Sequence, residues 1–203
     1  MPDALKKLIN DISLLPWIWD KTATKLAIFL LNSKNPYISS LKNSLTQIKE
    51  NISRCNNCWS LTNKEEDLCK ICKSQDRQKD IICIVEEYLD LLTIEQTWWY
   101  NWVYHVLGWA ISPINWIFVA DLNFKKLFER IEESSQNIEL ILATNPNIEW
   151  EATIAYIKEE IEKKWLNYKV KLTRLSRWLS SGYIEYADNI TILNSIKERK
   201  EVR

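Results

Sequence analysis

The hydrophobic positions of the first fifty residues repeat with the spacing of amphipathic helices. The apolar residues of the first two runs are Leu5, Leu8, Ile9 and Ile12, followed by Ala23, Leu26, Ala27, Leu30 and Leu31. The link at residues 15–20, Leu-Pro-Trp-Ile-Trp-Asp, is expected to be a turn. Asn35-Pro36 ends the second run, because the residue before a proline disfavours helical backbone. A third helix is expected from about Ile38 to Ile52.

From residue 80 onward the pattern changes to strands that alternate with helices. Residues 81–85 are a continuous apolar run, typical of a strand covered on both faces, residues 138–143 are expected to be a second buried strand, and residues 169–175 alternate. Helices are expected at residues 124–133 and 152–164. This order predicts βαβ units and a mainly parallel sheet.

The composition combines eleven Trp with two Gly in 203 residues. Globular proteins contain about 7% glycine, which predicts roughly 14 glycines here. Several tryptophans stand where a turn or a close backbone approach is expected: Trp17, Trp19, Trp109, Trp150 and Trp178. Such sites favour glycine, which has no Cβ. We therefore hypothesise that the gene comes from a lineage that reads the UGA codon as glycine.

The alternative is a Trp-rich protein with aromatic stacking sites. If tryptophan does occupy positions 17, 19 and 150, we expect exposed or strained indoles in turns.

The charge is balanced, with 27 basic and 27 acidic residues, so any contact with nucleic acid must come from a local patch. The N-terminus lacks the apolar stretch of a signal peptide. Residues 97–120 carry no Asp, Glu, Lys or Arg and could be read as a membrane span. Polar residues and a proline interrupt the segment, and five of its residues are Trp. We expect a strand and a loop there, and no membrane partner.

Five cysteines without a secretion signal favour a reducing compartment and a metal site over disulfides. Cys55 and Cys58 form one C-x₂-C pair, and Cys69 and Cys72 form another, with ten residues between the pairs. Four thiolates suit one structural, tetrahedral zinc ion per chain, and a site closed by four protein ligands is not catalytic. The alternative is a set of redox-active or incidental thiols. Cys83 lies in an apolar run and is expected to fill the core.

Several motifs in sequence order resemble the RecR family of bacterial recombination mediators over nearly the whole chain. Residues 14–23, Leu-Leu-Pro-Trp-Ile-Trp-Asp-Lys-Thr-Ala, are similar to the family's helix-hairpin-helix, except that Asp20 replaces a proline. The four cysteines follow, and residues 84–87 with Asp90 resemble the start of its Toprim domain. Tyr-His-Val-Leu-Gly-Trp-Ala-Ile-Ser-Pro at 104–113, Ala-Thr-Asn-Pro-Asn-Ile-Glu-Trp-Glu-Ala-Thr at 143–153, Thr-Arg-Leu-Ser-Arg-Trp-Leu at 173–179 and Glu-Tyr-Ala-Asp at 185–188 also resemble family segments.

The resemblance bears on the tryptophans as well. The family typically has glycine at Trp17, Trp19, Trp98, Trp102, Trp109, Trp116, Trp150 and Trp178, and commonly at Trp59 and Trp165. Trp99 alone stands at a variable position. After Trp178 the family usually has two further glycines, where this chain keeps one within Ser-Ser-Gly-Tyr.

The resemblance implies a multidomain α+β and α/β architecture. A helix-hairpin-helix DNA-binding domain is expected at residues 1–52 and a small four-cysteine zinc finger at residues 53–76. A Toprim α/β domain with a mainly parallel sheet is expected at residues 79–175, and a C-terminal segment that contacts another copy at residues 176–203.

The resemblance also implies a DNA-binding recombination mediator with no enzymatic turnover. It would act with RecO, and with RecF as a further candidate, to promote RecA loading on gapped DNA. Lys21 and Lys25 would contact phosphates, and glycine at Trp17 and Trp19 would let hairpin amides approach the DNA. The alternative for the two lysines is a solvated helix face. The implied state is a homo-oligomer, a dimer or ring-like tetramer, in the cytoplasm at the nucleoid.

Toprim enzymes hold magnesium with a Glu after one strand and an Asp-x-Asp after a later strand. Glu86 and Asp90 match the first part, and their alternative role is an ordinary acidic helix start. The second part reads Asn145-Pro146-Asn147, whose amides lack the charge that a catalytic magnesium needs. Glu149 and Glu151 remain for weak magnesium or partner contacts. We expect a non-catalytic Toprim domain.

Two other functions stay open. A magnesium-dependent nuclease or primase-like enzyme would use Glu86, Glu149 and Glu151. A binder of single-stranded nucleic acid would stack bases on Trp98, Trp99 and Trp102.

Overall fold

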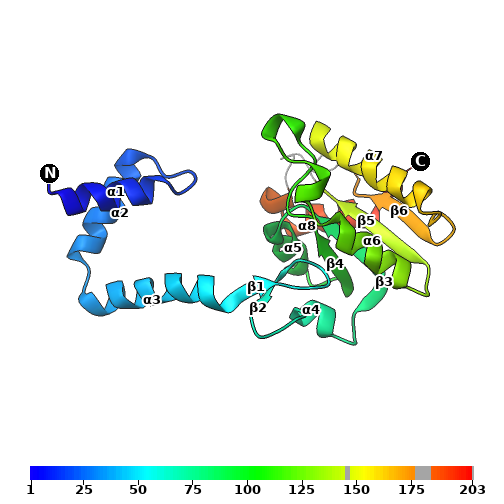
Figure 1. Ribbon diagram of the computed structural model, residues 1–203, viewed down its shortest axis with the longest axis horizontal. Coiled ribbons are helices and arrows are strands. Elements are labelled where there is room, and N and C mark those ends of the chain that lie inside the picture. Colours follow the sequence, from blue (N-terminus) through cyan, green and yellow to red (C-terminus); the bar gives the residue numbers. More distant parts are fainter. Residues whose placement is uncertain (145–146, 177–183, 203) are drawn as a thin grey trace. The chain divides into compact units, whose positions relative to one another are not determined.

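The computed structural model describes residues 1–144, 147–176 and 184–202, and it divides into two compact units (Figure 1). The first unit is Met1–Asn51 and the second is Ile52–Arg203. Each unit has its own arrangement of elements and is described by itself.

Three helices form the first unit: α1 (Asp3–Ser13), α2 (Asp20–Asn32) and α3 (Asn35–Asn51). Ile9 of α1 packs against Ala23 and Ala27 of α2, and these three residues are the buried core of the unit. No residue of α3 is buried. The third helix begins a few residues earlier than expected, because a proline is tolerated in the first turn of a helix.

The second unit is built on a five-stranded sheet of order β4-β3-β5-β6-β7. The strands are β3 (Gln78–Val85), β4 (Trp102–Val106), β5 (Ile138–Ala143), β6 (Val170–Arg174) and β7 (Lys200–Glu201). All neighbouring strands are parallel except β6 and β7, which are antiparallel. The register pairs Ile82 with Leu140 and Leu140 with Leu172. The mainly parallel sheet expected from the sequence is confirmed.

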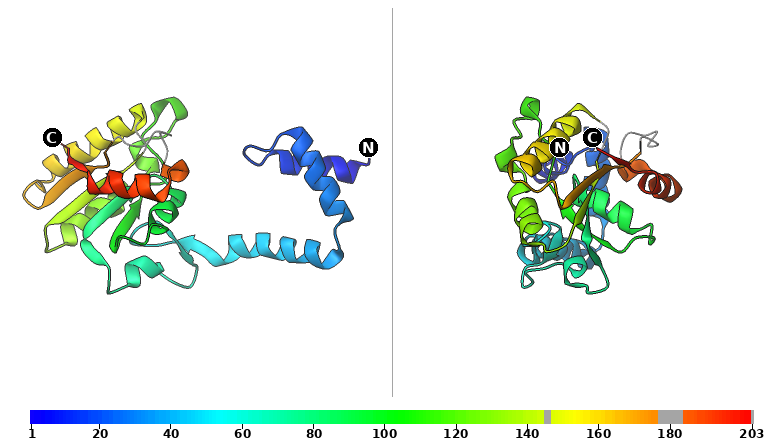
Figure 2. Two further views of the ribbon diagram at one scale, coloured as in Figure 1. Left: turned by 180° about the vertical axis from the view of Figure 1, so that it is seen from behind. Right: turned by 90° about the vertical axis from the view of Figure 1, so that its right-hand side faces the viewer.

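Helices cover both faces of this sheet (Figure 2). On one face lie α6 (Phe124–Glu133) and α7 (Ile148–Lys163), and on the other lie α5 (Tyr88–Glu95) and α8 (Asn189–Lys197). Strand β3 serves both faces, because Ile82 and Ile84 point to the α6 side while Cys83 and Val85 point to the α5 side. Cys83 is fully buried, as expected of a core residue. The second unit also has three short 3₁₀ helices, Pro113–Asn115, Val119–Asp121 and Ile184–Tyr186. Its first residues form the short strands β1 (Ile52–Arg54) and β2 (Leu61–Asn63) and the helix α4 (Lys70–Lys73).

The segment that could be read as a membrane span forms β4 and the loop after it. Within the described part of the chain, no helix has both the length and the apolar character needed to cross a bilayer.

Two expectations about tryptophan are wrong. Trp150 is 1% exposed, in the first turn of α7, because its indole packs into the core beneath that helix. Trp102 is 3% exposed within β4 and stacks on Tyr100, so it cannot belong to a base-stacking platform. Trp17 and Trp19 are exposed in the turn between α1 and α2, as expected. Trp178 lies outside the described residues.

Candidate metal centre and nucleic-acid interface

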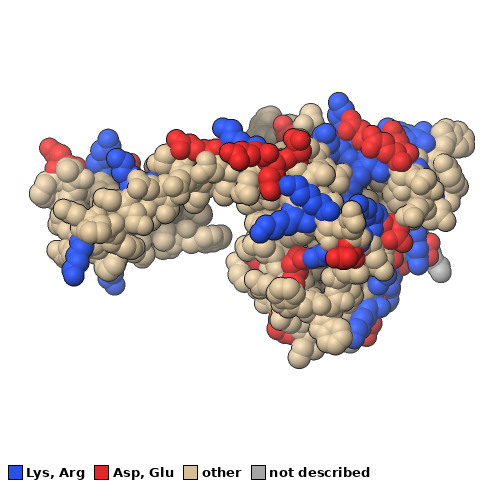
Figure 3. All heavy atoms as spheres, turned by 90° about the horizontal axis from the view of Figure 1, so that it is seen from below, with Lys and Arg blue, Asp and Glu red and all other residues tan. Residues whose placement is uncertain are grey.

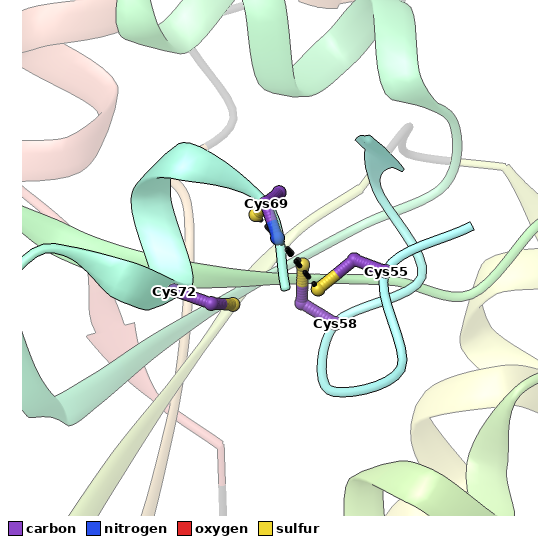
Figure 4. Close-up of side chains that lie close together, drawn as sticks. All are labelled: Cys55, Cys58, Cys69 and Cys72. Carbon is purple, nitrogen blue, oxygen red and sulfur yellow. Dashed lines mark hydrogen bonds between the residues drawn. The ribbon is translucent and has the colours of Figure 1, made fainter. Parts of the chain in front are cut away.

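The four cysteines lie on two short turns that face each other (Figure 4). A small antiparallel ribbon, β1 (Ile52–Arg54) and β2 (Leu61–Asn63), flanks the turn with Cys55 and Cys58. In the second pair, Cys69 is the N-cap residue of α4 (Lys70–Lys73) and Cys72 lies within that helix. The Asn56 N–H donates to the Asp67 carbonyl at 2.8 Å and joins the two turns. The turns therefore hold the four side chains on one centre.

The sulfur positions fit a tetrahedral ion. All four thiols are buried, and their sulfurs lie within 4.8 Å of one another. The Cys58 and Cys69 sulfurs are 3.6 Å apart. An ion about 2.3 Å from each of four sulfurs would separate them by about 3.8 Å. Among the described residues, this is the one group of three or more Cys, His, Asp or Glu side chains placed to hold a metal.

The protein supports the sulfurs by hydrogen bonding. The Cys69 N–H donates to the Cys55 sulfur at 3.3 Å, and the Asn57 amide donates to the Cys72 sulfur at 3.5 Å. The hydrogen bond from Cys58 lowers the pKa of the Cys55 thiol, and the same contact raises the pKa of Cys58. Because the four thiols lie so close together, some of them stay protonated in the absence of a cation. A bound cation would displace those protons.

The knuckle of residues 55–72 is hydrogen-bonded to the sheet. The Val106 N–H at the end of β4 donates to the Cys58 carbonyl at 2.8 Å. Arg130 of α6 donates to the Tyr104 carbonyl of the same strand at 2.8 Å. Burial lowers the pKa of Arg130, while the nearby cysteines, Cys72 first, act in the opposite direction. Metal binding at the knuckle is therefore tied to the packing of β4 and α6.

A buried histidine, for which the sequence analysis predicts no role, lies on the same strand. His105 is completely buried, and its Nε2 donates to the Asn123 carbonyl at 2.9 Å. Burial, with a further contribution from Arg130, lowers the pKa of His105 to about 3. The imidazole is therefore neutral at physiological pH, and it ties β4 to the loop before α6. An isolated histidine in an apolar run carries no sequence signal for such a contact.

The turn between α1 and α2 is the other candidate site. The Ile18 N–H donates to the Leu15 carbonyl at 3.2 Å and closes the turn over Pro16 and Trp17. Trp19 is the N-cap residue of α2, and its carbonyl accepts from the Thr22 and Ala23 N–H groups. The hairpin thus leads directly into a helix N-terminus, whose free amides favour anions.

Lys21 and Lys25 are both exposed on the first turns of α2. They lie one helical turn apart on one face of α2. Asp20 in the first turn of α2 offsets part of this positive charge. Trp17 and Trp19 are 89% and 79% exposed and crowd the same turn. On the face drawn in Figure 3, Lys and Arg are interspersed with Asp and Glu over the second unit, in keeping with the balanced charge.

The three glutamates expected at the Toprim site, Glu86, Glu149 and Glu151, each contact a different partner. Glu86, at the end of β3, accepts from the Trp150 indole N–H at 2.6 Å. Glu149 accepts from the Ser112 hydroxyl at 3.4 Å, and Glu151 forms an ion pair with Arg174 at 2.9 Å. These carboxylates do not form a group of metal ligands in the described residues. Asn145 and Pro146 lie outside those residues, while Asn147 caps α7 by accepting from the Trp150 backbone N–H.

Asp90 has a structural role in the first turn of α5. It accepts from the Glu87 N–H at 2.9 Å, within a capping box in which Glu87 is the N-cap residue. Burial raises the pKa of Asp90 to about 7, and the charges of Glu86, Glu87 and Glu185 add to the shift.

Comparison with known proteins places these sites in a family. The family model for the Toprim domain matches residues 80–176. "Recombination protein RecR" of Herpetosiphon aurantiacus is 37% identical over 202 residues, which cover 99% of this chain and 96% of that protein. "Recombination protein RecR" of Chloroherpeton thalassium is 36% identical over 203 residues, covering 98% and 97%.

The chain belongs to the RecR family. The protein is a recombination mediator in DNA repair, and the region that matches the Toprim domain contains β4, β5, β6 and most of β3, the parallel part of the sheet.

Proposed function

We propose that this RecR protein binds the DNA backbone through the hairpin and first turns of α2, using Lys21 and Lys25. On gapped DNA coated by single-strand-binding protein it acts with RecO, and with RecF as a further partner, to promote RecA loading. The observation that carries the proposal is the exposed lysine pair beside a helix N-terminus in a chain of the RecR family. Contacts of this kind position a protein on DNA without reading its sequence.

A binding assay on a gapped duplex tests this. The Lys21→Ala, Lys25→Ala double variant is expected to lose affinity roughly tenfold, and its plot of log affinity against log salt should become shallower by about two. Lys42→Ala, an exposed lysine of α3, is the matched control. Equal loss in the control, or an unchanged salt slope in the double variant, would contradict a local phosphate site.

The partner role has its own readout. RecA filament assembly on gapped DNA coated with single-strand-binding protein should be faster when the protein and RecO are both present. The double lysine variant should lose this stimulation. Stimulation that survives the loss of DNA binding would remove the hairpin from the mechanism.

We further propose that the four cysteines bind one structural zinc ion per chain. The buried donor set, its spacing and its N–H donors support zinc, and four protein ligands leave no open position for catalysis. Elemental analysis of the purified protein should give one zinc per chain.

The Toprim domain acts as a docking domain without turnover. The separate partners of Glu149 and Glu151 support this, as do the neutral amides of Asn145 and Asn147. Incubation with magnesium and gapped DNA should leave the DNA intact. Cleavage that disappears in a Glu86→Ala variant would instead favour a nuclease.

The proposed domain plan is a helix-hairpin-helix at residues 1–52, a zinc finger at 53–76, a Toprim domain at 79–175 and a C-terminal segment at 176–203. The C-terminal segment contacts another copy in a dimer or ring-like tetramer. The protein works in the cytoplasm at the nucleoid, where its DNA lies. Sedimentation of the full chain, compared with an Ile190→Asp variant at an exposed position of α8, tests the assembly contact.

A further inference from the structure

Every residue other than glycine with a positive φ in the described part of the chain is a tryptophan. The five are Trp17, Trp59, Trp98, Trp116 and Trp165, with φ between 55° and 67°. Tryptophan accounts for 11 of the 203 residues, so a chance selection of five residues would rarely include even two. Asparagine and aspartate are the residues enriched in this conformation, yet none of the five is either.

The turn after α1 has the pattern of a type II turn. Leu15 and Ile18 are joined by the closing hydrogen bond, Pro16 takes the second position, and Trp17 takes the third with a φ of 67°. Proline is common at the second position of this turn, and the third requires positive φ and hence glycine or asparagine. The surrounding sequence therefore specifies a turn to which tryptophan is unsuited.

The end of α7 requires glycine for a different reason. The Trp165 N–H donates to the Glu162 carbonyl at 3.0 Å, and the Leu166 N–H donates to the Ile161 carbonyl at 2.9 Å. These two bonds make a Schellman motif, in which the residue directly after the C-cap is left-handed and usually glycine. Trp165 holds that position with a φ of 55°.

Trp116 and Trp59 complete the pattern in two further settings. Trp116 is the left-handed C-cap of a 3₁₀ helix, with φ 58° and ψ 33°. Trp59 follows Cys58 in the cysteine knuckle with φ 58°, where its N–H closes the turn onto the Cys55 carbonyl at 3.0 Å.

Trp59 packs partly against the core, but the other four side chains give no compensating reason for the strain. Four of the five indoles are 81% to 91% exposed: Trp17, Trp98, Trp116 and Trp165. A tryptophan retained against backbone strain would be expected to bury its large apolar surface.

We infer that the native polypeptide carries glycine at positions 17, 59, 98, 116 and 165, because its gene uses UGA there and its cell reads UGA as glycine. The other tryptophans follow the same rule by codon, since UGA gives glycine and UGG gives tryptophan. Glycine at position 17 removes an exposed indole from the turn that precedes α2. The inference rests on backbone geometry and side-chain exposure and stands apart from the proposed DNA role.

The gene and the native protein together provide the test. All five codons are expected to be UGA, and a single UGG among them would overturn the assignment at that position. Trypsin should release residues 55–64 and residues 165–169, each with one tryptophan in the written sequence. In protein from the native cell, each peptide is expected to be lighter than written by about 129 Da, the difference between an indole side chain and a hydrogen. Masses that match tryptophan would overturn the inference, whatever the protein does on DNA.

Discussion

The two units of the chain differ in how they bury their apolar side chains. The first unit buries three core residues between α1 and α2, and α3 buries none. Large apolar residues stay exposed within it, among them Leu14, Phe29, Leu31 and Leu45. The second unit encloses a sheet between two apolar clusters and adds a four-cysteine centre. The second unit can therefore carry most of the chain's stability, while the first offers surface for contacts.

Metal removal should produce the largest difference between the units. A Cys58→Ser variant, or the wild type treated with a strong chelator, is expected to lose the zinc and on the order of 3 kcal/mol or more of unfolding free energy in the second unit. The reason is that Cys58 is also hydrogen-bonded to β4 through its carbonyl, so a loosened knuckle disturbs the sheet. Chemical denaturation and hydrogen exchange resolved by peptide would measure this.

Cys83→Ala is the matched control, since Cys83 is equally buried but lies in β3, away from the metal cluster. It should keep one zinc per chain and lose only about 1 kcal/mol or so for the small cavity. Slowed exchange should persist in α1 and α2 of both variants. Loss of protection in the first unit of Cys58→Ser would show that the two units do not unfold separately.

The next effect concerns the small core. Ile9→Ala is expected to cost about 2 kcal/mol, because it removes most of the apolar side chain that holds α1 on Ala23 and Ala27. In so thin a core this should open the helix pair and weaken DNA binding, while zinc content and the sheet stay intact. Hydrogen exchange of residues 3–32 would report the opening. Ile28→Ala, an exposed isoleucine of α2, should leave exchange and binding nearly unchanged.

The sequence predicted helices and strands best where the apolar residues formed a clear pattern. Residues 138–143 were predicted as a strand with the bounds that β5 has, because a short segment that is apolar except at Glu139 and lies between two predicted helices has few other arrangements. The cysteine spacing predicted a cluster that the fold indeed assembles. Helix α8 and the edge strand β7 were not predicted, because a short helix with mixed periodicity and a two-residue strand have little pattern of their own.

The contacts of the Toprim carboxylates could not be predicted from the sequence. The sequence marked Glu86 and Glu151 as candidate magnesium ligands. Their partners, Trp150 and Arg174, depend on how β3, α7 and β6 pack together. The burial of Trp150 was missed for the same reason. A position beside a predicted turn is compatible with either an exposed or an inward-facing side chain, and only tertiary packing decides between them.

A buried carboxyl makes the second unit sensitive to pH. The folded pKa of Asp90 is raised to about 7 by burial and by the charges of Glu86, Glu87 and Glu185, while an unfolded Asp titrates near 4. The folded state therefore holds a proton that the unfolded state has released, and stability should fall as pH rises from about 4 to about 7. Asp90→Asn keeps an acceptor for the Glu87 N–H and removes the titration.

We expect Asp90→Asn to be more stable than wild type by on the order of 2 kcal/mol at pH 8, with the difference vanishing near pH 4. Urea denaturation across this range measures it, and the difference between the two proteins cancels the shared effect of cysteine protonation. A constant difference at every pH would mean that Asp90 acts through packing and not through its proton.

The smallest expected effects come from glycine substitutions at single left-handed tryptophans, one in each unit. Trp165→Gly should relieve the left-handed backbone after α7 and raise the unfolding free energy of the second unit by about 1 kcal/mol. Trp99→Gly is the control, because Trp99 is also exposed but is not among the positive-φ residues. Glycine there adds chain entropy and removes the contact between Lys197 and the Trp99 ring, so it should destabilise slightly. Trp17→Gly carries the same relief in the first unit, whose core is too small to couple it to the sheet. Its benefit should therefore appear as slower exchange in α1 and α2, with no change in the transition of the second unit. A shift of that transition by Trp17→Gly would mean that the hairpin and the sheet fold as one cooperative structure. The second unit would then not carry its stability separately from the first.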